Sequence, residues 1–206
     1  MLRLIAMASM LIDHVGATFF PEAIWLRIIG RAAFPLYAWG IASGYRRTRN
    51  WKLYAARLFI TGCITQLPYA WLFKSGDLNV CFTLLAGLLL LKVLNGRNNP
   101  LKLIGSIALL ALTHFLRFEY GLYGIFTILV FYFYQKDRKL PLYQGVLTLL
   151  GMLVYSFHYI QIFSIISSWL VLNVKDDRLR LPRLIQYGFY PVHIVILLIL
   201  REFAGM

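Results

Sequence analysis

Two adjacent ionisable residues, Asp13 and His14, interrupt the first apolar stretch of this 206-residue chain. Ionisable side chains inside apolar segments are costly to keep, so those that persist are candidates for function. Neighbours on a helix point about 100° apart, so each needs a partner on another helix. Arg31 is the expected partner of Asp13, and His14 is the expected general base. The alternative is an Asp–Arg pair that only locks two helices together.

A basic stripe follows in the next apolar segment. Arg27, Arg31 and Pro35 are spaced four residues apart, so they lie along one face of a helix. Pro35 leaves the Arg31 carbonyl without its helical donor, which predicts a kink there. A kink beside a buried arginine exposes a backbone acceptor where a polar site can form. A bend needed only for packing is the alternative.

A second polar stripe lies near the C-terminus. Gln186, Tyr190 and His193 fall on one face of an otherwise apolar helix. We expect His193 and Tyr190 to face His14, where they would stabilise a developing oxyanion or position an acceptor. The alternative is a histidine held by hydrogen bonds in a structural role.

Further polar residues in or beside the apolar segments are candidates for substrate binding. They are Gln66, Tyr69, Asn79, Thr83, Glu119 and Tyr120. The carboxylate of Glu119 could receive Arg117 or a substrate amine. The alternatives are that these residues hold membrane helices together or anchor them at the interface.

The composition places these residues in a membrane protein. Hydrophobic residues make up 60% of the chain, aromatic residues 16% and charged residues 14%. Soluble domains average about 45–50% apolar and about 25% charged residues. A water-soluble fold of this size could not hide so much apolar surface. The sequence therefore predicts an all-α integral membrane protein with a single domain over residues 1–206 and no soluble domain.

Nine apolar segments predict a polytopic bundle of about nine transmembrane helices. They are Leu2–Phe20, Glu22–Gly44, Trp51–Phe73, Asn79–Leu94, Pro100–Leu116, Tyr120–Tyr134, Pro141–Phe157, Tyr159–Val174 and Leu181–Phe203. With the N-terminus in the cytoplasm, sixteen of the 21 Lys and Arg residues fall at the inner side. The exceptions are Arg27, Arg31, Lys74, Arg117 and Arg201. The tight turn at residues 157–159 leaves an eight-helix bundle as the fallback.

This topology explains the formal charge of +13 without nucleic acid. It also places Asp13 and all four histidines in the outer half of the membrane. The histidines are His14, His114, His158 and His193. On the inner side, Arg46 and Arg47 could grip the phosphates of a nucleotide-like donor, although the positive-inside rule alone accounts for them.

Several chemistries have no signature in the chain. It carries no Walker loop, dinucleotide fingerprint, nucleophile elbow or metal-ligand spacing. Cys63 and Cys81 both lie in apolar runs, so they predict neither a disulfide framework nor a metal site.

Motifs along nearly the whole chain resemble the TraX family, membrane acetylases that include the enzyme modifying the N-terminus of conjugative F-type pilin. The motifs are Leu11-Ile12-Asp13-His14, Gly30-Arg31-Ala32-Ala33-Phe34-Pro35, Gln66, Asn79, Tyr120-Gly121 with Gly124, and Phe189-Tyr190-Pro191 with His193. The resemblance implies acetyl transfer from cytoplasmic acetyl-CoA, in a multi-pass protein of the bacterial inner membrane. The implied acceptor is a pilin, another exported protein or a glycan.

We therefore expect an acetyltransferase without a metal, in which His14 deprotonates the acceptor or briefly carries the acetyl group. Asp13 and Arg31 would form the buried pair that orients the site. An oligomer is possible. The competing interpretation is a small transporter or an envelope-complex assembly protein, in which the polar cluster forms a path or a docking face. A transporter should need polar groups in both halves of the membrane.

Overall fold

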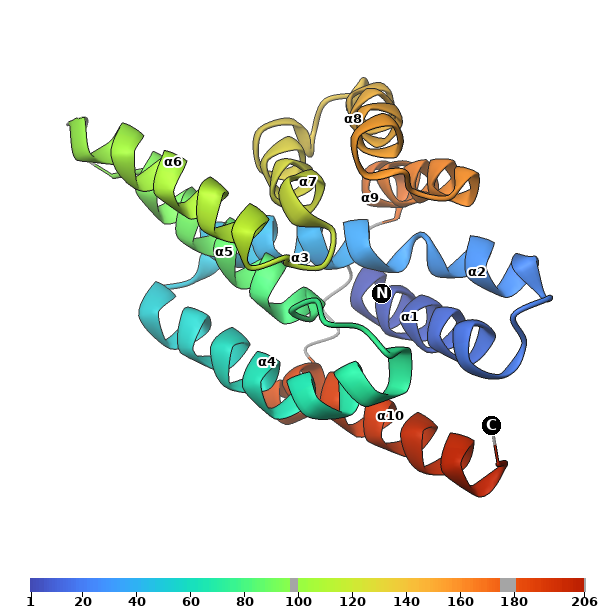
Figure 1. Ribbon diagram of the computed structural model, residues 1–206. Helices are drawn as coiled ribbons and strands as arrows, with labels where there is room; N and C mark the ends of the chain where they lie inside the picture. The colour runs from blue at the N-terminus through green and yellow to red at the C-terminus, as the bar shows by residue number, and fades with distance from the viewer. Residues whose placement is uncertain (97–99, 175–180, 206) are drawn as a thin grey trace.

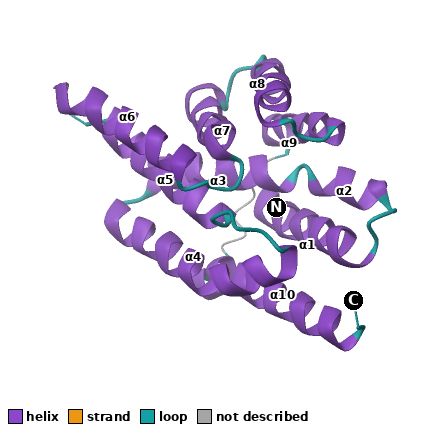
Figure 2. Cartoon of the chain, viewed as in Figure 1, coloured by secondary structure: helices purple, strands orange, loops and turns teal. Residues whose placement is uncertain are grey.

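The computed structural model describes residues 1–96, 100–174 and 181–205. In these residues the chain is all-helical, with short connecting loops (Figure 2). The elements are α1 (Leu2–Phe19), α2 (Ile24–Gly30), α3 (Ala33–Arg47), α4 (Trp51–Phe73), α5 (Val80–Leu94), α6 (Pro100–Phe115), α7 (Gly121–Tyr134), α8 (Leu140–Tyr155), a 3₁₀ helix η1 (Tyr159–Ile165), α9 (Ile166–Asn173) and α10 (Arg183–Phe203). Four cations assigned to the inner side, Arg97, Lys175, Arg178 and Arg180, lie outside the described residues.

Seven of the nine expected segments are single helices with nearly the expected ends. The segment 22–44 is not one helix, because the chain breaks at Arg31 and Ala32 between α2 and α3. The kink expected from Pro35 is therefore wrong in position. Pro35 lies in the first turn of α3, where the missing N–H has no helical acceptor to lose. The segment 159–174 begins as the 3₁₀ helix η1 before α9.

Helix α3 occupies the centre of the molecule, in contact with α1, α5, α7 and α9 (Figure 1). Its central position follows from its sequence, because small or apolar residues face every side. Ala38 and Ala42 are fully buried, and Trp39 is nearly so. Helices α4 and α10 lie side by side, and α6 packs along α5 at the edge (Figure 1).

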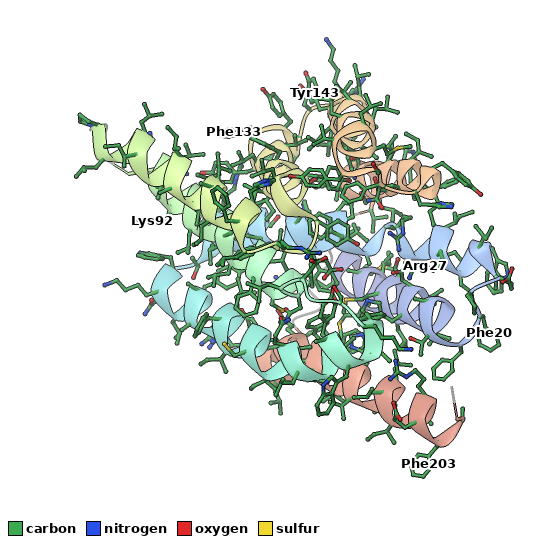
Figure 3. All side chains as sticks on the ribbon, viewed as in Figure 1. Phe20, Arg27, Lys92, Phe133, Tyr143 and Phe203 are labelled. Carbon is green, nitrogen blue, oxygen red and sulfur yellow. The ribbon has the colours of Figure 1, made fainter. Side chains whose placement is uncertain are left out.

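Large apolar side chains cover much of the outer surface. Phe203, Leu184 and Leu153 are each more than four-fifths exposed, and Phe20 and Phe203 lie at the periphery (Figure 3). Among the described residues, α1 and α10 are long and apolar enough to cross a membrane, and five further apolar stretches are shorter. The all-helical class is confirmed, and the nine-span arrangement stays a prediction.

Candidate active site

The centre of the site is the Asp13 carboxylate, which two arginines hold. Nη2 of Arg31 donates to Oδ1 of Asp13 at 2.6 Å, and Nη1 of Arg27 donates to Oδ2 at 2.9 Å. Nη1 of Arg27 also donates to the Asp13 backbone carbonyl at 2.9 Å. Arg27 extends from α2 beside α1 (Figure 3). The sequence predicted the Arg31 contact, and the structure adds Arg27 as a second partner.

The break between α2 and α3 positions these arginines. Gly30 ends α2 directly against Asp13, and a Cβ at this position would overlap the carboxylate. The N–H of Arg31 still donates to the Arg27 carbonyl, so the two arginines stay one helical turn apart and both reach Asp13. Glycine at position 30 therefore follows from close packing around the ion pair.

A hydrogen-bonded chain of buried polar side chains extends from Arg31 toward α8. Nη1 of Arg31 donates to Oε1 of Gln161 at 3.1 Å, and Nε2 of Gln161 lies 3.4 Å from the Tyr123 hydroxyl. Tyr123 in turn pairs with Thr148 at 3.2 Å, and Thr148 with Ser164 at 3.2 Å. This chain holds the guanidinium in the orientation that faces Asp13. Sequence reasoning missed it, because isolated Gln, Tyr and Thr residues carry no spacing signal.

The two predicted catalytic histidines meet across α1 and α10. Nδ1 of His14 lies 2.9 Å from Nε2 of His193, and the rings stack at 13° with centroids 5.1 Å apart. Nδ1 of His193 lies 2.7 Å from the Phe189 carbonyl oxygen, which can only accept a hydrogen bond. His193 therefore carries its proton on Nδ1 in the neutral form and accepts at Nε2. His14 must donate from Nδ1, so its Nε2 is free to take a proton.

A cavity of about 460 Å³ opens beside His14 and Asp13. Its wall also includes Arg27 and Arg31 from one side, and Glu119 from the loop before α7. Tyr69, Asp77, Tyr120, His158 and Gln161 also line the cavity. Three of the four histidines thus lie in or beside this cavity, whereas His114 lies exposed at the end of α6. In the described part of the chain, no three His, Cys, Asp or Glu residues are arranged to hold a metal.

Glu119 is a half-buried acid with no cation paired to it among the residues that the structure describes. Its backbone N–H donates to the Leu78 carbonyl at 2.8 Å, which fixes the loop beside α5. One carboxylate oxygen, Oε2, is buried without a hydrogen-bond partner. Burial raises the pKa of Glu119 from 4.5 to about 7, chiefly because the charged form loses its hydration. Arg117, the partner that the sequence suggested, pairs instead with Asp77 at 3.0 Å.

Three of the predicted substrate-binding residues do not line the cavity. Their side chains form hydrogen bonds around the loop that carries Glu119. Gln66 binds the backbone carbonyl of Asp77 and the side chain of Asn79, at 3.0 and 2.8 Å. Asn79 caps α5, and its amide donates to the Gly62 carbonyl at 2.8 Å. The Thr83 hydroxyl donates to the Glu119 carbonyl. Together they fix the loop that carries the acid.

Tyr120 lines the cavity, whereas Tyr190 lies outside it beside the two histidines. Tyr120 has a left-handed backbone with φ of 63° and stacks on Phe34 with ring centroids 4.0 Å apart. Such backbone conformations are uncommon for a bulky residue and cluster at functional sites. The hydroxyl of Tyr190 is buried and has no hydrogen-bond partner in the described part of the chain, and its ring centroid lies 6.5 Å from that of His14. Tyr190 thus brings an unsatisfied donor next to the histidine pair.

The basic residues proposed for donor phosphates separate from one another. Arg46 lies over the Tyr132 ring, 4.6 Å from its centroid, and donates to the Tyr132 carbonyl. Arg47 donates to the Ser43 carbonyl at 3.2 Å. Gln186, which the sequence grouped with Tyr190, lies two turns of α10 before His193 and accepts from Arg3 at 2.8 Å.

The described residues thus form an all-helical protein. Its polar site lies between α1, α2 and α10, where the Asp13 ion pair lies beside two histidines. The chain belongs to the TraX family, because the model of that family, described as TraX protein, matches residues 1–201. The resemblance seen in the sequence is thereby confirmed.

Two relatives are similar to the chain. The probable fimbrial assembly protein FimC, serogroup H1, of Dichelobacter nodosus is 31% identical over 232 aligned residues, covering 95% of this chain and 92% of that protein. The uncharacterized protein RP591 of Rickettsia prowazekii (strain Madrid E) is 36% identical over 74 residues, covering 36% of this chain and 28% of that protein. No solved structure matches the chain.

Proposed function

We propose that the protein is a multi-pass membrane acetyltransferase that moves an acetyl group from acetyl-CoA to the amine of an exported protein's N-terminus. The observation that carries this proposal is the fixed hydrogen-bond direction from His14 through His193 to the Phe189 carbonyl. It leaves Nε2 of His14 unprotonated beside a cavity lined by Glu119, whose Oε2 has no hydrogen-bond partner among the described residues. Family membership and the fimbrial relative support a substrate among pilus subunits.

His14 acts as the general base. The α-amine of a peptide has an ordinary pKa of about 7.7–8.0, so near neutrality it arrives largely as an ammonium group. The Glu119 carboxylate binds that ammonium, because it lines the cavity and, within the described part of the chain, pairs with no cation. Glu119, whose pKa is raised to about 7, takes the first proton from the ammonium, leaves a neutral amine and later releases this proton to water. Nε2 of His14 then accepts the second proton, which leaves the nitrogen as the C–N bond forms.

The transfer step balances with these groups. The amine nitrogen attacks the thioester carbonyl carbon, and a C–N bond forms as the C–S bond breaks. The proton taken by His14 passes to the departing CoA thiolate, which leaves as a thiol. The Tyr190 hydroxyl donates to the carbonyl oxygen, whose negative charge grows in the transition state.

Asp13 and its two arginines set the electrostatics beside the base. One carboxylate between two guanidinium groups leaves a net positive charge near His14. A nearby positive charge favours the neutral form of the imidazole, which is the form that a base requires. Arg27 and Arg31 also line the cavity, where they attract the C-terminal-side carbonyl groups of a peptide acceptor.

The proposal is tested with purified protein, labelled acetyl-CoA and a short peptide with a free N-terminus. The matched control is the same peptide with a blocked N-terminus, and a sugar acceptor covers the glycan class. We expect transfer to the free N-terminus alone. Transfer to the sugar alone would overturn the assignment of the acceptor, and transfer to none of the three would overturn the acetyltransferase.

A non-catalytic assembly role is the second candidate, favoured by the name of the fimbrial relative. The two roles separate in cells that assemble pili with the protein present. A His14→Ala variant that accumulates normally should lose acetylation of the pilin and keep any assembly role that depends only on docking.

A further inference from the structure

A second hollow, which we call the slot, lies between α1, α3, α4, α5 and α10 on the other side of Tyr190. It has a volume of about 120 Å³ and is lined mainly by apolar side chains. The lining residues include Met7, Met10, Gly40, Leu84, Cys81 and Tyr190. None of these except Tyr190 takes part in the site described above. The slot is therefore a separate element that the transfer mechanism has not used.

The slot runs between the Arg3 end of α1 and the histidine pair. Arg3 and Gln186 lie at one end, and Met10, Cys81 and Tyr190 lie at the other. On α1, Arg3 and His14 are separated by about 16 Å, from a rise of about 1.5 Å per residue. At the far end Tyr190 lines the slot, and its ring also lies 5.6 Å from that of His193. The slot thus ends beside the proposed base.

Cationic side chains surround the Arg3 end. Tyr54 and Tyr187 line the slot there, and each interacts electrostatically with more than one arginine. The arginines are Arg3, Arg47, Arg57 and Arg183. The Arg57 guanidinium also lies 6.0 Å from the centroid of the Tyr187 ring. Guanidinium groups bind phosphate through paired hydrogen bonds, so this end fits a ligand with several phosphates.

We infer that the slot binds the donor, with the pantetheine arm of acetyl-CoA between the helices and its phosphates at the arginines around Tyr54 and Tyr187. This inference rests on the proposed function. The fit is one of shape and charge: the slender arm matches the narrow slot, where Thr61, Gln186 and Tyr190 offer polar groups to its two amides. The phosphates match the cationic end. The thioester then lies beside the unpartnered Tyr190 hydroxyl. Arg46, bound to Tyr132 on α7, does not line the slot.

Gly40 offers a way to fill the slot without disturbing the fold. It lies within α3, and a Cβ there would meet no atom within 4 Å. Gly188 in α10 is equally open, is half-buried like Gly40, and does not line the slot. Leucine at either position gains helix propensity of about the same size. Gly40→Leu and Gly188→Leu are therefore a matched pair.

The test is calorimetric titration of the detergent-purified protein with acetyl-CoA. We expect Gly40→Leu to weaken binding at least tenfold and Gly188→Leu to leave it unchanged. If the wild-type protein binds acetyl-CoA and Gly40→Leu binds it equally well, the slot is wrong and the acetyltransferase stands. If the wild-type protein does not bind acetyl-CoA, the donor and with it the slot are both overturned.

Cys81 gives a second measurement on an unfilled slot, in case Gly40→Leu does not fold. Cys81 lines the slot and is buried, whereas Cys63 is exposed and lies elsewhere on α4. In a Cys63→Ala protein, acetyl-CoA should slow alkylation of Cys81 by a small maleimide several-fold. In the reciprocal Cys81→Ala protein, alkylation of Cys63 should not change. An unchanged rate at Cys81, as expected if a lipid tail occupies the slot, would overturn the inference.

Discussion

Gly30 and Asp13 are packed so closely that the carboxylate occupies the space where any other residue at position 30 would place its Cβ. The contact joins the end of α2 to the middle of α1, at the point where Arg27 and Arg31 converge on Asp13. Glycine is thus the residue that lets two helices and two guanidinium groups share one acid. The ion pair depends on backbone packing as much as on charge.

A methyl group at position 30 should displace the Asp13 carboxylate from its arginines. We expect Gly30→Ala to lower the free energy of unfolding by about 1–3 kcal/mol, the usual range for overpacking. Thermal unfolding in detergent measures the change. Gly188→Ala, where a Cβ meets nothing within 4 Å, is the control. Equal unfolding temperatures for the two variants would contradict the packing argument.

Removing the charge of Asp13 should be more damaging than removing that of Asp77. Asp13→Asn leaves two largely buried guanidinium groups without a counter-charge, and we expect a loss of about 3 kcal/mol. The pair between Asp77 and Arg117 is solvent-exposed, so Asp77→Asn should cost less than about 1 kcal/mol. Similar losses in both variants would show that the Asp13 centre is not the buried ion pair described here.

Glu119 predicts a pH dependence of stability. Its pKa is raised from 4.5 to about 7 in the folded protein, so the folded state holds this proton more tightly than the unfolded chain. The corresponding stabilisation is complete below about pH 4.5 and is lost as the pH rises through about 7. Between pH 5 and 8 the unfolding temperature should therefore fall more in the wild-type protein than in Glu119→Gln. The exposed Glu22→Gln variant should follow the wild type, and parallel curves for all three would refute the assignment.

Replacing Tyr190 by Phe should lower the rate of acetyl transfer without lowering the stability of the fold. The Tyr190 hydroxyl has no partner among residues 1–96, 100–174 and 181–205, so Tyr190→Phe removes no hydrogen bond within these residues. If the hydroxyl stabilises the oxyanion, kcat should fall by about 10²–10³, as for the loss of one such donor. Steady-state kinetics with the peptide acceptor measures this, and an unchanged kcat would remove Tyr190 from the transition state.

The sequence predicted most of the helices, since their apolar runs end at loops rich in polar residues. It also predicted that Asp13 pairs with Arg31 and that His14 meets His193, because costly polar groups in apolar segments must satisfy each other. The same reasoning could not find Gln161 or Tyr123. Their importance comes from a hydrogen-bonded chain between distant segments, and no local spacing encodes it.

The position of the break between α2 and α3 could not be predicted from the local sequence either. Pro35 pointed to a kink within one long helix, but the chain turns at Arg31 because the close packing of Gly30 on Asp13 decides where α2 ends. Likewise Gln66, Asn79 and Thr83 have the residue types of a binding site, yet their partners are backbone atoms around the Glu119 loop. Whether such a polar residue lines the cavity or holds a neighbouring loop in place is therefore decided by its tertiary contacts and not by its residue type.

The most direct test of the central claim compares acetyl transfer by the wild-type protein and by His14→Ala, with labelled acetyl-CoA and a peptide with a free N-terminus. His114→Ala is the control, because His114 lies exposed at the end of α6 and away from the cavity. We predict that His14→Ala still accumulates and binds acetyl-CoA but transfers at a rate lower by about 10²–10⁴, while His114→Ala keeps the wild-type rate. A near-normal rate in folded His14→Ala would contradict the account.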